Sequence, residues 1–168
     1  THNLTLSLIV SVAWAFILFT FAPLIIRFYE LEPHIAANAI NYLRIVSTAF
    51  PFVFMSAAFT GIFNAGGRSK IPFTINGIGL VANMILDPLF IFVFDWKTDG
   101  AALATWLAQA CVFGLFIYQL KVKKILWEDF RFFGKLKKVY TTRIIKIGLP
   151  VATLNTLFAF VNMFLGRT

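Results

Sequence analysis

The sequence predicts an all-α, polytopic transmembrane helical bundle, and three observations support this fold class. Of its 168 residues, 60% are hydrophobic and only 13% are charged, whereas soluble domains carry about 25% charged residues. The apolar residues form successive runs of about 20 residues or more, long enough as helix to cross roughly 30 Å of hydrocarbon. These runs do not alternate in polarity, as the short strands of a transmembrane β-barrel do.

Five segments are expected to cross the membrane. The first four lie at about 4–28, 35–63, 71–94 and 100–120, and the fifth covers 144–168. Because the chain starts and stops abruptly at apolar runs and has no signal-peptide pattern, we expect an internal fragment of a longer protein. Its expected partners are therefore the lipid bilayer and the remaining helices of the same polypeptide.

The connections between these segments alternate in charge. Residues 29–34 and 95–99 are net acidic, whereas 64–70 are basic, and nine of the fifteen Lys and Arg residues fall between Lys121 and Lys146. The positive-inside bias predicts that the basic loops 64–70 and 121–146 are cytoplasmic. Since membrane topology explains the net charge of +8, we expect no nucleic-acid partner.

Residues 121–143 mix lysines with aromatic side chains such as Trp127 and Phe130. Two interpretations remain open: a basic amphipathic helix lying against anionic headgroups, or a linker whose charge sets the topology. Neither implies catalysis. The sequence also lacks the common zinc-protease, phosphate-loop and serine-hydrolase motifs and any Cys/His cluster, so we expect neither an enzyme nor a bound cofactor.

Polar residues within the third span are the main candidates for a functional site. Asn76, Asn83 and Asp87 are spaced seven and four residues apart, so they share one helical face. A charged carboxylate at this depth costs about 2.5–3.5 kcal/mol. Asp87 must therefore face the bundle interior, a water-filled cavity or a cation, or stay protonated, which suits it to bind and release H⁺ or Na⁺. The alternative is that Asp87 caps a broken helix or pairs with a neighbouring helix for packing alone.

Pro88 is expected to disturb the helix one turn back, near Met84, and so to free backbone carbonyls as ligands. In the next span, Thr105 and Gln109 are four residues apart and share a face. The Thr105 hydroxyl is a candidate to join the Asp87 site. Gln109, like Asn76, is a candidate to line a cavity, and interhelical packing is the alternative for both Thr105 and Gln109.

Arg44 is the only basic residue well inside a predicted span, about two to three turns from the outer edge. A guanidinium at this depth either pairs with an acid or reaches toward the interface. A structural ion pair is favoured over a role in substrate binding.

Several short motifs resemble the multidrug and toxic compound extrusion (MATE) transporters. They occupy 42–45, 66–72, 83–92, 100–105 and 147–150, and their order and spacing together are specific. The resemblance covers nearly the whole chain. It implies a fold of twelve helices in two six-helix lobes around a central cavity.

On this resemblance, the chain is a partial MATE-type fold. Residues 1–120 form part of the first lobe, as its helices three to six. Residues 121–143 are the cytoplasmic linker between the lobes, and 144–168 open the second lobe with its first helix.

The resemblance also implies a site and a mechanism. Family members with a coupling site in the first lobe use an Asn and an Asp one turn apart on helix five and a Thr on helix six, which match Asn83, Asp87 and Thr105. An Asp on helix one completes that site and lies outside this chain. The implied function is cation-coupled antiport, in which H⁺ or Na⁺ drives export of a small organic, often cationic, compound across the cell membrane by alternating access.

Two alternatives remain, one from the same superfamily and one from another class. A lipid-linked oligosaccharide flippase of the same superfamily is disfavoured because such cavities are usually lined by several Arg and Lys residues, whereas Arg44 stands alone. A non-transporting membrane scaffold subunit would not need Asn83 and Asp87 on one mid-membrane face.

Overall fold

The computed structural model describes residues 2–121 and seven further residues: Thr142, Gly148, Thr153, Leu154, Leu157, Phe158 and Val161. The elements are α1 (His2–Arg27), α2 (Pro33–Ser47), α3 (Phe50–Ala65), α4 (Lys70–Pro88), the π-helix η1 (Leu89–Val93) and α5 (Lys97–Lys121). No strand occurs in this described part, and the predicted all-α fold class is confirmed. The predicted linker 121–143 and the fifth span 144–168 lie largely outside the described residues.

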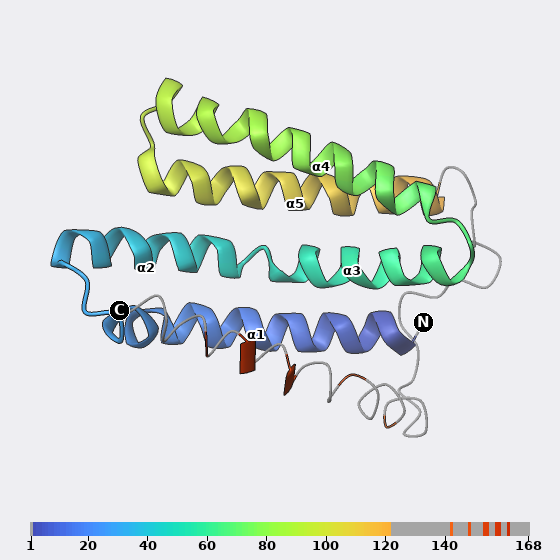
Figure 1. The fold of residues 1–168 in the computed structure, drawn as a ribbon, viewed down its shortest axis with the longest axis horizontal. Coiled ribbons are helices and arrows are strands. Elements are labelled where there is room, and N and C mark those ends of the chain that lie inside the picture. The colour runs from blue at the N-terminus through green and yellow to red at the C-terminus, as the bar shows by residue number, and fades with distance from the viewer. Residues whose placement is uncertain are drawn as a thin grey trace.

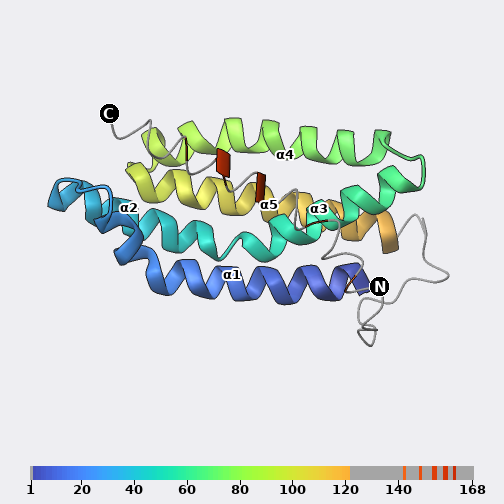
Figure 2. The ribbon, with the colours of Figure 1, turned by 60° about the horizontal axis from the view of Figure 1, so that its bottom comes forward.

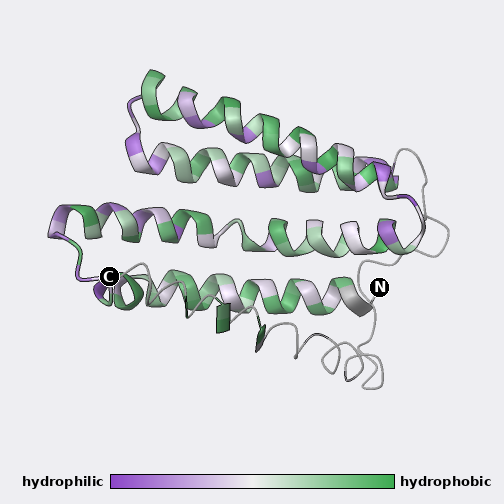
Figure 3. Ribbon diagram, in the orientation of Figure 1, coloured by the Kyte–Doolittle hydropathy of each residue, from purple (hydrophilic) through white to green (hydrophobic). Residues whose placement is uncertain are grey.

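The helices lie side by side along one long axis (Figures 1 and 2), in the order α1, the α2–α3 pair, α5 and α4. Three segments are each long and apolar enough to cross a membrane: α1, α4 with η1, and α5. The α2–α3 pair gives a fourth if the two helices form one span. Figure 3 shows hydrophobic residues along the helices and hydrophilic residues at the connections. The chain is therefore a multi-pass membrane protein, as predicted.

The second predicted span, 35–63, is broken rather than continuous. Its two helices are bent by 45° at residues 48–49. Pro51, in the first turn of α3, has no N–H to donate to the carbonyl of Ser47. In addition, the hydroxyls of Ser47 and Thr48 each donate to a backbone carbonyl three residues earlier, at 2.7 Å, a contact that tends to bend helices.

The third predicted span keeps its length but changes its helix type. The α-helix continues past Met84 to Pro88, so the prediction of a disturbance near Met84 is wrong. The backbone N–H of Leu89 still reaches the carbonyl of Ile85, so the loss of one donor at Pro88 does not open the helix. The change follows the proline instead: η1 is π-helical, and its widened turn is closed by the N–H of Phe94 on the carbonyl of Leu89 at 3.2 Å.

The two ends of the bundle are packed by different kinds of residue. At the end with the α3–α4 turn and Lys121, which we call the basic end, Phe116 of α5 is fully buried. Its ring centroid lies 5.7 Å from that of Phe59 and 5.9 Å from that of Phe63, both on α3. Toward the opposite, acidic end the buried residues are mostly small: Ala22, Ser47, Ala49, Gly100, Ala102 and Ala104. Small residues allow the helix backbones to approach closely. Two surface grooves, one mainly between α1 and α2 and one between α1, α2 and α5, also lie toward this end.

Candidate functional site

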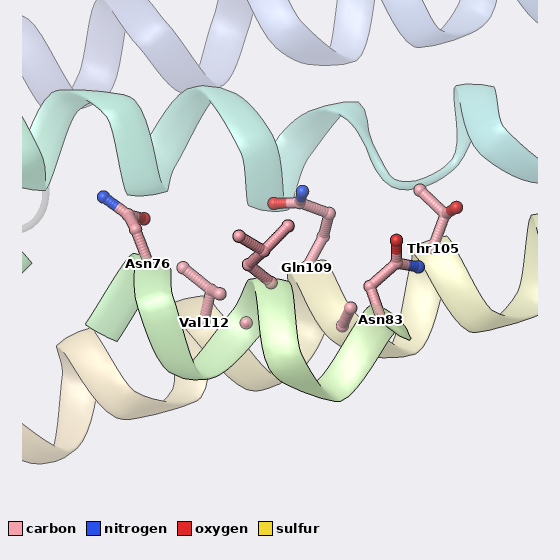
Figure 4. A pocket seen from close by; sticks show the side chains of 8 residues that line it. Asn76, Asn83, Thr105, Gln109 and Val112 are labelled. Atoms are coloured by element: carbon pink, nitrogen blue, oxygen red, sulfur yellow. The ribbon is translucent and has the colours of Figure 1, made fainter. Parts of the chain in front are cut away.

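A cavity of about 260 Å³ lies between α4 and α5. It is lined by Asn76, Gly79, Leu80, Asn83, Thr105, Ala108, Gln109 and Val112. Figure 4 shows its four polar side chains pointing to the same side, toward the α2–α3 pair, with Asn76 and Asn83 on α4 and Thr105 and Gln109 on α5. The structure thus brings four of the five predicted polar residues into one cavity.

The two walls of this cavity meet at Gly79. Gly79 is buried, and a Cβ placed on it would collide with Cγ2 of Val112 on α5. Only a residue without a side chain lets α4 and α5 approach this closely. Gly79 lies three residues after Asn76 and four before Asn83, so it shares their helical face. This spacing is the signal that sequence reasoning missed.

Asp87 adjoins the cavity rather than lining it. It is half-buried and lies one helical turn beyond Asn83, toward the acidic end. Asn83 Nδ2 donates a hydrogen bond to Asp87 Oδ1 at 3.4 Å, near the upper limit for such a bond. Asn83 therefore connects the carboxylate to the cavity.

Thr105 faces Asn83 across the cavity, but no hydrogen bond joins Thr105 to Asp87 in the described part of the chain. Its hydroxyl donates to the carbonyl of Ala101 on its own helix at 3.1 Å. Because that bond uses only the proton, the hydroxyl oxygen can still accept a bond or coordinate a cation. A carboxylate, an amide oxygen and a hydroxyl are ligands that suit a proton or a hard cation.

The two predicted cavity-lining residues differ in their surroundings. Asn76 Nδ2 donates to the hydroxyl oxygen of Thr60 on α3 at 3.5 Å, so Asn76 connects α4 to α3 as well as lining the cavity. Gln109 is half-buried in the opposite wall. Asn76 therefore both contacts α3 and lines the cavity.

Arg44 is half-buried on α2. It lines a groove against α5 that shares no residue with the α4–α5 cavity. The expected ion pair does not occur among the described residues, and the Arg44 Nε nitrogen is buried without a hydrogen-bond partner there. Its guanidinium carbon lies 5.5 Å from the ring centroid of Phe19 on α1. Phe19 is 25 residues away in the sequence, so sequence spacing could not reveal this contact.

This fold and this cavity define a class of protein: a multi-pass α-helical membrane protein with a polar cavity between two of its spans. Residues 1–89 match the model of the MatE family, and the chain belongs to that family. The resemblance stated from the sequence motifs is confirmed.

Relatives with curated names support the same family. The chain is 31% identical over 130 residues to the multidrug export protein MepA of Staphylococcus aureus strain N315, covering 74% of this chain and 28% of that protein. It is 38% identical over 80 residues to Protein DETOXIFICATION 42 of Arabidopsis thaliana, covering 48% of this chain and 16% of that protein. The chain thus spans less than a third of either relative.

Solved structures of related transporters share the fold. A MATE crystal structure in the bent conformation matches with a TM-score of 0.86 and 25% identity, covering 97% of this chain and 36% of that one. An inward-facing multidrug resistance MATE transporter matches with a TM-score of 0.81 and 25% identity, covering 89% of this chain and 34% of that one. The partial MATE-type fold is therefore confirmed.

Proposed function

We propose that the chain is part of a secondary antiporter in which H⁺ or Na⁺ drives the export of small organic compounds by alternating access. MepA is named as a multidrug export protein, and the chain belongs to the same family. The observation that carries the proposal is the pairing of Asn83 with Asp87 beside a cavity that Thr105 also lines.

In this proposal, Asn83, Asp87 and Thr105 supply part of the coupling site. A membrane-embedded carboxylate is costly while it is charged and unpaired. A proton or Na⁺ at Asp87 removes that cost and changes how Asn83 and the facing wall of α5 pack. Because a ligand shifts a conformational equilibrium only through its different affinity for the two states, this change in packing favours one side of the alternating-access equilibrium.

The charge distribution supports one orientation in the membrane. The turn between α3 and α4 carries Arg68, and α4 begins at Lys70. The positive-inside bias predicts that this basic end is cytoplasmic and that the acidic end, with Glu30, Glu32 and Asp95, lies on the outer side of the cell membrane. Asp87 then lies nearer the outer surface, where an inward-moving cation arrives first.

The test uses the complete transporter that contains this chain, purified and reconstituted in proteoliposomes. Transport of the fluorescent organic cation ethidium is measured with an imposed H⁺ or Na⁺ gradient. Asp87→Asn is expected to abolish gradient-driven transport, because the amide cannot exchange a proton or neutralise a cation. Asp87→Glu is expected to retain part of it.

Asp95→Asn is the matched control, because Asp95 is exposed in the η1–α5 connection and lies outside the cavity. This variant is expected to transport like the unmodified protein. Undiminished, gradient-dependent transport by Asp87→Asn would exclude Asp87 from the coupling site. The gradient that drives transport in the unmodified protein identifies the coupling ion.

A further inference from the structure

A second groove, separate from the α4–α5 cavity, lies between α1, α2 and α5 and has a volume of about 410 Å³. It is lined by Phe19, Arg44, Ile45, Thr48, Leu103 and Trp106. This volume is within the range of small-molecule sites, about 300–1,000 Å³. The groove shares no lining residue with the cavity beside Asp87.

Arg44 is the single cationic group of this groove. Among the described residues no carboxylate lies within ion-pair distance of it, and its Nε has no acceptor. The Thr48 hydroxyl already donates to the carbonyl of Ile45 at 2.7 Å, so the side-chain donors that the lining offers are the Arg44 guanidinium and the indole N–H of Trp106, and only the guanidinium is charged. The Phe19 ring under the guanidinium gives a favourable contact but does not neutralise the charge.

Two aromatic side chains line the groove together with this charge. Phe19 comes from α1, and Trp106 comes from α5. The Trp106 ring is held edge-on against Phe52 of α3, with centroids 5.4 Å apart and planes at 85°. Aromatic walls with one convergent polar group are typical of a site that binds a planar, apolar molecule and orients it by a single charged group.

The depth of the groove distinguishes a small molecule from a lipid headgroup. Arg44 lies eleven residues after Pro33, the first residue of α2, which at 1.5 Å per residue is about 16 Å along the helix. This depth is well below the headgroup phosphates of a bilayer whose hydrocarbon core is about 30 Å thick. A compound that enters the bundle reaches it, and a phosphate held at the membrane surface does not.

We propose that this groove binds an aromatic compound that carries one carboxylate, oriented by the guanidinium of Arg44 between Phe19 and Trp106. A planar carboxylate matches the planar fork of Arg and neutralises its charge in a low-dielectric setting. The inference rests on the proposed export function, because it adds aromatic carboxylates to the compounds that the transporter binds. The binding itself needs no transport and is measured separately.

The experiment compares two probes of the same shape and opposite charge, 2-naphthoate and 2-naphthylmethylammonium. Their binding to the complete transporter in nanodiscs is measured by calorimetry. Arg44→Gln is expected to weaken binding of 2-naphthoate by about tenfold or more, since a hydrogen bond to a charged group is lost. Binding of the ammonium probe is expected to stay the same or to strengthen.

Two further variants keep the test decisive. Arg27→Gln removes an equal charge at the exposed end of α1 and is expected to leave 2-naphthoate binding unchanged. Phe19→Leu keeps Arg44 and removes one aromatic wall, and it is expected to weaken binding several-fold. This second variant also covers the case in which Arg44→Gln does not fold.

Three results would overturn the proposal: equal binding of the two probes, unchanged 2-naphthoate binding in Arg44→Gln, or loss of folding in Arg44→Gln with unchanged binding in Phe19→Leu. The last result would instead assign Arg44 to an ion pair with another part of the transporter. Asp87→Asn is expected to bind 2-naphthoate normally. If it does so but still transports, the coupling role of Asp87 fails while this binding site stands.

Discussion

Gly79→Ala tests whether α4 and α5 are held together by direct helix contact. The new Cβ would overlap Cγ2 of Val112, a side chain that is itself buried. Because Val112 is β-branched and stiff at χ1, it cannot rotate away without cost, so the two helices must separate. Overpacking of this kind costs about 1–3 kcal/mol.

The matched control is Gly77→Ala, two residues earlier in α4. A Cβ there meets nothing within 4 Å. Both substitutions gain about 1 kcal/mol of helix propensity, since Ala replaces Gly in each. The two variants therefore differ by the packing cost alone, and we expect Gly79→Ala to be less stable than Gly77→Ala by about 1–3 kcal/mol.

The assay is thermal unfolding of the complete transporter in detergent, with both variants compared with the unmodified protein. Gly77→Ala is expected to raise the melting temperature slightly. Gly79→Ala is expected to melt several degrees below Gly77→Ala, at roughly 2–4 °C for each kcal/mol. Equal melting temperatures for the two variants would refute the close contact between Gly79 and Val112.

Two further predictions concern packing. Phe116 is 0% exposed, and Phe116→Ala is expected to lower the free energy of unfolding by about 3–5 kcal/mol. Phe73 is 81% exposed, and Phe73→Ala is expected to lower it by less than about 0.5 kcal/mol. Thermal unfolding measures both, and similar losses would contradict the buried aromatic cluster. Gly100→Ala places its Cβ 2.8 Å from the carbonyl oxygen of Phe90 and is expected to lower the melting temperature, while Gly114→Ala meets nothing within 4 Å and is expected not to. A stable Gly100→Ala variant would show that η1 and α5 are further apart.

The broken second span illustrates a local signal that hydropathy analysis overlooks. The apolar run 35–63 is continuous in hydropathy, but Pro51 removes a backbone donor and two hydroxyls bond back to carbonyls just before it. These residues were present in the sequence, so the break could have been predicted. Pro88 shows the opposite case: another proline inside an apolar run leaves the α-helix intact and is followed by a π-helix.

The candidate site was predictable where it depends on one helix. Asn83 and Asp87 are four residues apart, and helical geometry alone predicts that their side chains meet. Their contact with the cavity wall on α5 depends on how Gly79 and Val112 bring two helices together. Of the predicted contacts, the one between Asp87 and Thr105 stays a prediction, because no hydrogen bond joins them in the described part of the chain.

The sequence by itself determined the class of molecule. Hydropathy runs and charged connections are summed over many residues, so they predict the four membrane segments that the structure describes without knowledge of neighbouring helices. The four-residue spacing of Asn83 and Asp87 likewise predicts their pairing from one helix alone. Only the tertiary structure decided what lies beside Arg44. The Phe19 ring that its guanidinium contacts is on α1, and Trp106, which lines the same groove, is on α5, so these residues come from segments far apart in the chain. Helix packing in a membrane depends on small differences in side-chain shape that no periodicity records.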